Sequence, residues 1–123
     1  MKPVLVDTSV WRGYFRGSAK VQDLGPLLEE DDAVLVHPFI LGELVLGGLS
    51  TKEEALFDHL PRVVLVSHAE VLALVRQRRR MRRGIGWIDA HLLASVLVSS
   101  ALLWTVDTNL AAVAAELKVG FRT

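Results

Sequence analysis

Four acidic residues stand in stretches of the sequence that are otherwise apolar. Asp7 directly follows the apolar run 4–6, and Asp107 directly follows the run 101–106. Runs of this kind form buried parallel strands, and α/β folds bind ligands at the carboxyl ends of such strands. Each Asp is also followed by Thr, which suits the N-cap of a helix. A ligand-binding role and a capping role are therefore both open for these two residues.

Glu43 and Asp89 are harder to explain as structural residues. Glu43 lies within the apolar segment 39–46, and Asp89 precedes a helical pattern with apolar residues three, four and seven positions further on. A carboxylate on such a surface costs at least several kcal/mol in desolvation unless a cation or hydrogen-bond donors compensate it. A surface glutamate and an aspartate at a helix N-terminus are the structural alternatives.

Two kinds of cation are available to compensate these acids. The arginine-rich run 76–83 offers salt bridges, but it is so dense that most of it must be solvated. Magnesium and manganese prefer oxygen ligands, and the chain contains neither cysteine nor a His-x-x-x-His pair to suit zinc. Many phosphodiester-cleaving enzymes use carboxylate-bound ions of this type. The acids therefore favour a divalent metal site.

Alternating strands and helices are predicted to position the acids. Apolar runs at 4–6, 33–36, 63–66 and 101–106 predict strands covered on both faces, with a short fifth at 119–121. Helices are predicted at 21–30, 38–49, 51–60, 67–83, 88–99 and 108–117. This order predicts the α/β class, as a three-layer α/β/α sandwich around a mostly parallel, doubly wound sheet of four to five strands. If strands 4–6 and 101–106 flank the switch point, Asp7 and Asp107 face one crevice.

The length and composition predict one compact domain over residues 1–123. Of the 123 residues 51% are hydrophobic, which is enough for a filled core. The start of the chain is not a signal peptide, and the longest uncharged apolar stretch, 92–106, is shorter than the roughly 20 residues of a membrane span. We therefore expect a cytoplasmic protein without a membrane partner.

Charge is balanced over the whole chain but not along it. The net charge is zero, yet residues 62–123 hold 9 basic and only 4 acidic residues. Six of those basic residues lie in the run Arg76–Arg83. Such a run suits contacts with RNA phosphates, and it equally suits the solvated C-terminal end of a helix. The sequence leaves these two alternatives open.

Taken together, the motifs resemble those of the PIN-domain nucleases, and within them the VapC toxins of prokaryotic toxin–antitoxin pairs. The resemblance covers essentially the whole chain. It rests on four motifs in order: Val-Leu-Val-Asp7-Thr8-Ser9 with Trp11, then Glu43, then Gly84-Ile85-Gly86-Trp87-Ile88-Asp89-Ala90, and finally Thr105-Val106-Asp107. Each motif alone is weak, whereas the ordered set of four is specific.

The resemblance implies a site made of four acids. It makes Asp7 and Asp89 the most direct ligands of Mg²⁺ or Mn²⁺, while Glu43 and Asp107 complete the shell partly through water. Supporting hydroxyl groups are implied at three positions, Thr8, Ser9 and Thr105.

It also implies an activity and partners. These are endoribonuclease cleavage of RNA phosphodiester bonds, a cognate antitoxin that occupies the active-site groove, and a homodimer. Two alternatives come from other classes. A phospho-acceptor receiver-like signalling domain would need an acceptor Asp after the third strand, where Ser67 and His68 stand instead. A non-catalytic RNA-binding relative would be expected to lose the acids.

Overall fold

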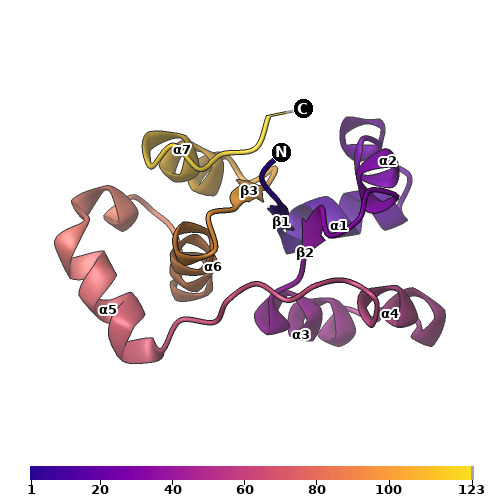
Figure 1. Cartoon of the computed structure of the whole chain (residues 1–123), viewed down its shortest axis with the longest axis horizontal. Helices are drawn as coiled ribbons and strands as arrows, with labels where there is room; N and C mark the ends of the chain where they lie inside the picture. The colour runs from indigo at the N-terminus through magenta and orange to yellow at the C-terminus, as the bar shows by residue number, and fades with distance from the viewer. Residues whose placement is uncertain (123) are drawn as a thin grey trace.

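A small parallel sheet forms the centre of the molecule (Figure 1). The computed structural model describes residues 1–122, apart from the side chain of Arg80. Strand β1 (Val4–Val6) lies between β2 (Val34–Leu35) and β3 (Leu102–Trp104), and it pairs in parallel with both. The residues of β1 are fully buried. This matches the apolar, β-branched runs that predicted strands covered on both faces.

Helices connect the strands and cover the sheet. The sheet order is β2-β1-β3, so the first crossover leads from β1 to one neighbour, β2, and the second leads from β2 past β1 to the other neighbour, β3. The two crossovers therefore run in opposite directions across the sheet. Right-handed crossovers in opposite directions place their helices on opposite faces, and Figure 1 shows α1 and α2 across β2 from α3 and α4. The predicted doubly wound α/β architecture is confirmed. The helices are α1 (Thr8–Phe15), α2 (Leu24–Leu28), α3 (Pro38–Leu46), α4 (Thr51–Phe57), α5 (His68–Gln77), α6 (Trp87–Val98) and α7 (Thr108–Glu116), with 3₁₀ turns η1 (Ala19–Val21) and η2 (Arg79–Arg82).

The predicted sheet of four to five strands has three strands in the structure. Segment 63–66 is not a strand, since its neighbour Arg62 forms a single bridge with Val36 and pairing goes no further. Val64 and Leu65 are 51% and 60% exposed and form surface, whereas Val63 is buried in the core. The predicted strand 119–121 likewise contributes one bridge, between Gly120 and Leu103. An apolar run by itself does not distinguish these outcomes.

Two predicted helices are also shorter than expected. The segment 21–30 is helical only over α2, because Pro26 lacks an N–H and is tolerated only in the first turn of a helix. The segment 67–83 begins as predicted, with a capping box between Ser67 and Glu70, but α5 ends at Gln77. Arg78 is extended, with φ −112° and ψ 93°. Arginines three and four residues apart repel one another on a helix, which favours this early end.

The orientation of α1 is held by packing of aromatic rings. Trp11 is fully buried, and its ring centroid lies 4.6 Å from that of Phe57 and 5.7 Å from that of Phe15. This contact positions the N-terminal turn of α1, which carries Thr8 and Ser9. No helix in the described part of the chain is long and apolar enough to cross a membrane.

Candidate active site

Strands β1 and β3 end side by side. Val6 pairs with Trp104, and the N–H of Asp7 donates to the carbonyl oxygen of Trp104 at 2.9 Å. The two strands therefore flank the switch point, as the sequence predicted. Their register also places Thr105, rather than Asp107, next to Asp7.

Asp7 is buried and held by two hydroxyl groups. Its side chain is 7% exposed, and its Oδ2 accepts hydrogen bonds from Ser9 Oγ and Thr105 Oγ1, each at 2.8 Å. The residue occupies the N-cap position of α1, but its carboxylate makes no capping hydrogen bond. The capping alternative therefore does not explain why an acid stands here.

The two hydroxyl groups are themselves oriented by the backbone of the β3–α7 turn. Ser9 Oγ accepts from the N–H of Val106 at 3.2 Å, and Thr105 Oγ1 accepts from the N–H of Asp107 at 3.1 Å. Each hydroxyl group receives a hydrogen bond from the backbone and directs its own proton to Asp7. This network links the ends of β1 and β3 and sets the orientation of one carboxylate.

Asp107 has a different local role. It is exposed, and its Oδ1 accepts a hydrogen bond at 2.8 Å from the N–H of Leu110, so that it caps α7. The capping alternative is confirmed for this residue. Its other carboxylate oxygen makes no hydrogen bond within the described residues, and it is available for a ligand.

Glu43 reaches the site from α3. The residue is half-buried, and its Oε1 accepts a hydrogen bond at 2.9 Å from Oγ1 of Thr8, which is buried at the start of α1. Both residues were candidates from sequence, but their pairing was not predicted. No local signal points to it, since 35 positions separate them.

The pKa of Asp89 depends on the other three acids. It lies in the first turn of α6, and its Oδ2 accepts a hydrogen bond from the N–H of Gly86 at 3.2 Å. Burial raises the pKa of the Asp89 carboxyl, and the charges of the other three acids raise it further against the lowering effect of the Gly86 hydrogen bond. The pKa of Asp89 is thus raised by the charges of all three of the other acids. No Lys or Arg side chain within the described residues forms an ion pair with any of them.

The donor set fits a hydrated hard cation better than a fully protein-enclosed one. Within the described residues, no three His, Cys, Asp or Glu side chains are grouped closely enough to hold a metal ion. Magnesium usually takes one or two carboxylates and keeps several waters. The carboxylates of Asp7, Glu43 and Asp107, whose charges raise the pKa of Asp89, would attract such an ion without enclosing it.

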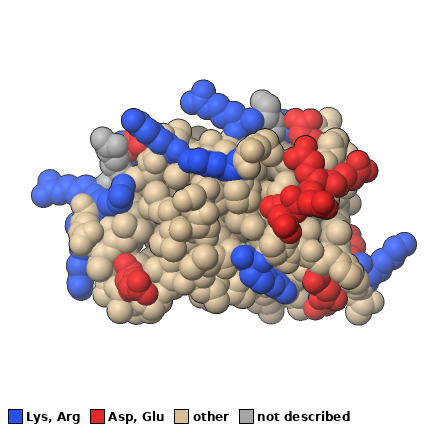
Figure 2. Space-filling view, in the orientation of Figure 1, with Lys and Arg blue, Asp and Glu red and all other residues tan. Residues whose placement is uncertain are grey.

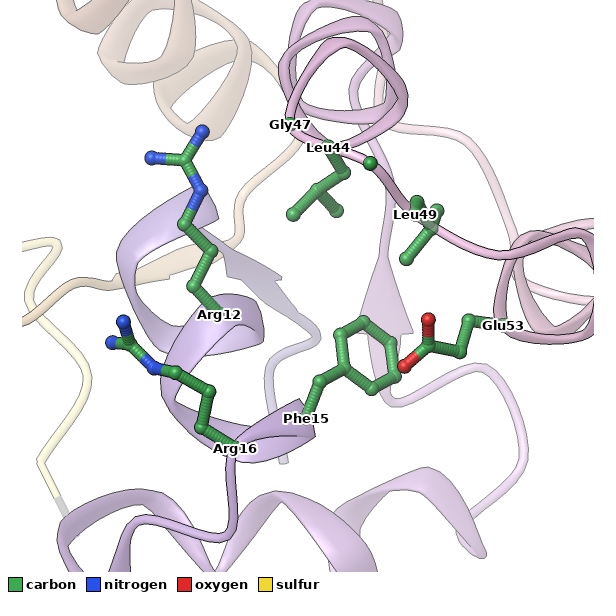
Figure 3. Close-up of a pocket in the computed structure, with 8 residues that line it drawn as sticks. Arg12, Phe15, Arg16, Leu44, Gly47, Leu49 and Glu53 are labelled. Atoms are coloured by element: carbon green, nitrogen blue, oxygen red, sulfur yellow. The ribbon is translucent and has the colours of Figure 1, made fainter.

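A hollow of about 260 Å³ lies between α1 and the C-terminal end of α3 (Figure 3). It is lined by Arg12, four residues after Thr8 in α1, and by Gly47, which follows the end of α3 four residues after Glu43. One helical turn therefore separates the hollow from the Thr8–Glu43 hydrogen bond. Its other lining residues are partly apolar and partly charged: Phe15, Arg16, Leu44, Gly48, Leu49 and Glu53.

The chain matches a known domain family over nearly its whole length. The PIN domain profile matches residues 4–116, and the chain belongs to this family. Two curated relatives, both called Ribonuclease VapC32, come from the CDC 1551 / Oshkosh and ATCC 25618 / H37Rv strains of Mycobacterium tuberculosis. Each is 44% identical over 116 residues, which cover 92% of this chain and 91% of the relative.

Proposed function

We propose that this protein is a VapC-type toxin, an endoribonuclease that hydrolyses RNA phosphodiester bonds with Mg²⁺ or Mn²⁺. The proposal is supported by a PIN domain in which the charges of Asp7, Asp107 and Glu43 raise the pKa of Asp89 and no described Lys or Arg forms an ion pair with these acids. The 44% identity to proteins named as ribonucleases supports RNA as the substrate. The receiver-like alternative is not favoured, because a PIN domain has no phospho-acceptor function. We take residues 1–123 as a single nuclease domain.

We assign the direct metal contacts to Asp7 and Asp89. Each of the four acids has one carboxylate oxygen that accepts hydrogen bonds and one that accepts none within the described residues, so hydrogen bonding does not rank them, and the assignment follows the family resemblance. Glu43 and Asp107 are assigned to the outer part of the shell, through water. A bound divalent ion would neutralise the charge that develops on the scissile phosphate.

The residues of the chain then have distinct tasks. Ser9 and Thr105 keep Asp7 in one orientation, which lowers the cost of reorganisation when charge develops. Thr8 does the same for Glu43. We assign Glu43 to accept the proton of the attacking water, while the leaving ribose oxygen takes a proton from solvent. This balances the hydrolysis of one P–O bond.

The test is cleavage of a single-stranded RNA by the purified protein, with Mg²⁺, with EDTA and as the Asp89→Asn variant. We expect cleavage only by the unmodified protein with metal, and a loss of about 1000-fold for the variant. Asp58→Asn is the matched control, because Asp58 is an exposed acid at the end of α4. Cleavage by Asp89→Asn at the unmodified rate would overturn the site assignment.

A cognate antitoxin follows from the same proposal, and the hollow of Figure 3 suits it. Arg12 and Arg16 stand beside apolar side chains such as Phe15 there, so an acidic segment with apolar residues would be complementary. Expression without the partner should arrest growth, and co-expression should relieve the arrest. Growth arrest that the co-expressed partner does not relieve would contradict this pairing.

We also propose a cytoplasmic homodimer. Phe39, Val64, Leu65 and Trp87 are each 38–60% exposed, and an apolar cavity of about 340 Å³ lies between α3, α5 and α6. Exposed apolar patches of this kind mark association surfaces. Sedimentation analysis of the Leu65→Asp variant tests the assignment, since a dimer at this surface should dissociate.

A further inference from the structure

Arginines form an exposed strip between α5 and α6. We define the arginine strip as Arg78, Arg79, Arg82 and Arg83, all of which are exposed. Because α5 ends at Gln77, these residues lie beyond the helix. Compensation of the α5 dipole therefore accounts for Arg76 and for the C-cap residue Arg78 but not for Arg79 and Arg82, which lie further along the chain. Figure 2 shows Lys and Arg side chains at the α5 and α7 end of the molecule, and the largest acidic group over α2 at the other end.

The strip is anchored to the body of the protein. Met81, between the arginines, is 2% exposed and belongs to the core. Arg83 forms an ion pair with Glu116 of α7 at 2.7 Å. The backbone is therefore held in place while the remaining guanidinium groups point to solvent.

The strip lies beside the C-terminal end of α7, and the N-terminal end of the same helix carries Asp107. Arg78 and Arg79 line a hollow together with Leu117, just after the C-terminal end of α7. At the other end, a Cβ on Gly84 would come 3.3 Å from the side chain of Asn109, two residues after Asp107. The distance between those two ends of α7 is about 12 Å, from eight residues at 1.5 Å each. The strip thus lies at the C-terminal end of α7, about one helix length from the acids, and the chain that follows it reaches the N-terminal end of α7 at Gly84.

No acidic side chain neutralises the outward-facing arginines. Residues 62–123 contain four acids, of which Asp89 and Asp107 belong to the active site and Glu70 caps α5. The fourth acid is bound to Arg83. Arg78, Arg79 and Arg82 form no ion pair within the described part of the chain. Clustered like charges destabilise a compact chain, so an external anion is the natural partner.

We propose that Arg78, Arg79 and Arg82 bind consecutive phosphates of the RNA strand and guide that strand along α7 into the acidic site. The proposal rests on the proposed ribonuclease function. It adds the path of the bound RNA strand, which would run along α7 from the arginine strip to the acids. Arginine contacts with phosphates carry no sequence information, so the proposed contact is with the backbone and not with particular bases. The acids alone repel RNA, and the strip supplies the attraction that they lack.

The test measures binding of a single-stranded RNA oligonucleotide as a function of salt, in EDTA so that no cleavage occurs. The triple variant Arg78→Ala, Arg79→Ala, Arg82→Ala should reduce the slope of log K against log salt by about 2, from 0.7 per lost phosphate contact. The matched control replaces Lys20, Lys52 and Arg62 by Ala. These residues are exposed cations outside the strip, and their replacement changes the net charge equally.

Two further measurements separate the possible outcomes. The triple arginine-to-lysine variant should keep the slope, because the contact is electrostatic. RNA that carries neutral methylphosphonate linkages to one side of the cleavage site should bind to the unmodified protein more weakly than ordinary RNA does. The triple alanine variant should bind both RNAs equally well. Equal slopes for the triple variant and its control would overturn the proposal, as would loss of antitoxin binding with unchanged RNA binding. If the unmodified protein binds RNA with the predicted slope but never cleaves it, the ribonuclease function fails instead.

Discussion

The same three residues, Val-Asp-Thr, stand at the end of β1 and one residue after β3, yet the two aspartates have different surroundings. Asp7 is buried and receives two hydroxyl hydrogen bonds, whereas Asp107 is exposed and caps α7. The register explains the difference. Val6 pairs with Trp104, so Asp7 aligns with Thr105, and Asp107 lies two residues further along the chain. Identical local motifs therefore acquire different roles through their position relative to the neighbouring strand.

The largest expected difference is in catalysis. Asp7→Asn should lower kcat/KM for RNA by about 1000-fold, since it removes a directly assigned metal ligand. Asp107→Asn should lower it only about 10- to 100-fold, as expected for a group that acts through water. Both substitutions keep the side-chain shape. Equal losses for the two variants would remove the distinction between the strand ends.

A second experiment concerns Thr105, which contacts both strand ends. Thr105→Val removes the hydroxyl group that donates to Asp7 and accepts from the N–H of Asp107, with little change in volume. We expect a loss of about 10- to 100-fold in kcat/KM. Thr108→Val is the control, because Thr108 is exposed and its hydroxyl group makes no hydrogen bond within the described residues. Similar activity of the two variants would show that the hydroxyl network is dispensable.

A smaller effect should appear in stability. Asp107→Ala removes the cap of α7 and should lower the free energy of unfolding by about 1 kcal/mol. Asp107→Asn should leave it nearly unchanged, because asparagine caps as well as aspartate. The side chain of Asp7 makes no capping hydrogen bond, so loss of a cap should not make the free energies of unfolding of Asp7→Ala and Asp7→Asn differ. Denaturant unfolding of the metal-free variants measures both differences.

The smallest effect is a change in the pKa of Asp89. The charges of Asp7 and Asp107 both raise this pKa, and Asp7 contributes more. Asp7→Asn should therefore lower it more than Asp107→Asn does, as measured by NMR titration of the metal-free protein. A larger shift for Asp107→Asn would reverse the comparison.

The same pKa predicts how stability depends on pH without metal. The folded-state pKa of Asp89 is raised above its unfolded value, so a bound proton stabilises the fold at pH values below about 3.9. That stabilisation is lost as the pH rises through the raised pKa. The free energy of unfolding of Asp89→Asn should not fall in this way as the pH rises. The difference in stability between this variant and the unmodified protein should therefore be largest above the raised pKa.

Much of the fold follows from local sequence. Strands β1 and β3 are short, apolar and uninterrupted, and helix starts such as Ser67 with Glu70 carry their own hydrogen bonds. The prediction failed where local pattern and tertiary environment disagree. Val64 and Leu65 have strand-like composition, but they face solvent. The arginine-rich end of the predicted helix 67–83 lies outside α5, because Arg78 is extended and the residues Arg79–Arg82 form a separate 3₁₀ turn.

The sequence by itself determined which four acids form the candidate site, since a carboxylate after an apolar strand or within an apolar helix is recognisable locally. Only the tertiary structure decided which acid is buried, which one caps a helix, and which hydroxyl group holds each of them. Those pairings join residues 35 and 98 positions apart. They depend on strand register and helix packing, which no local pattern of residue types encodes.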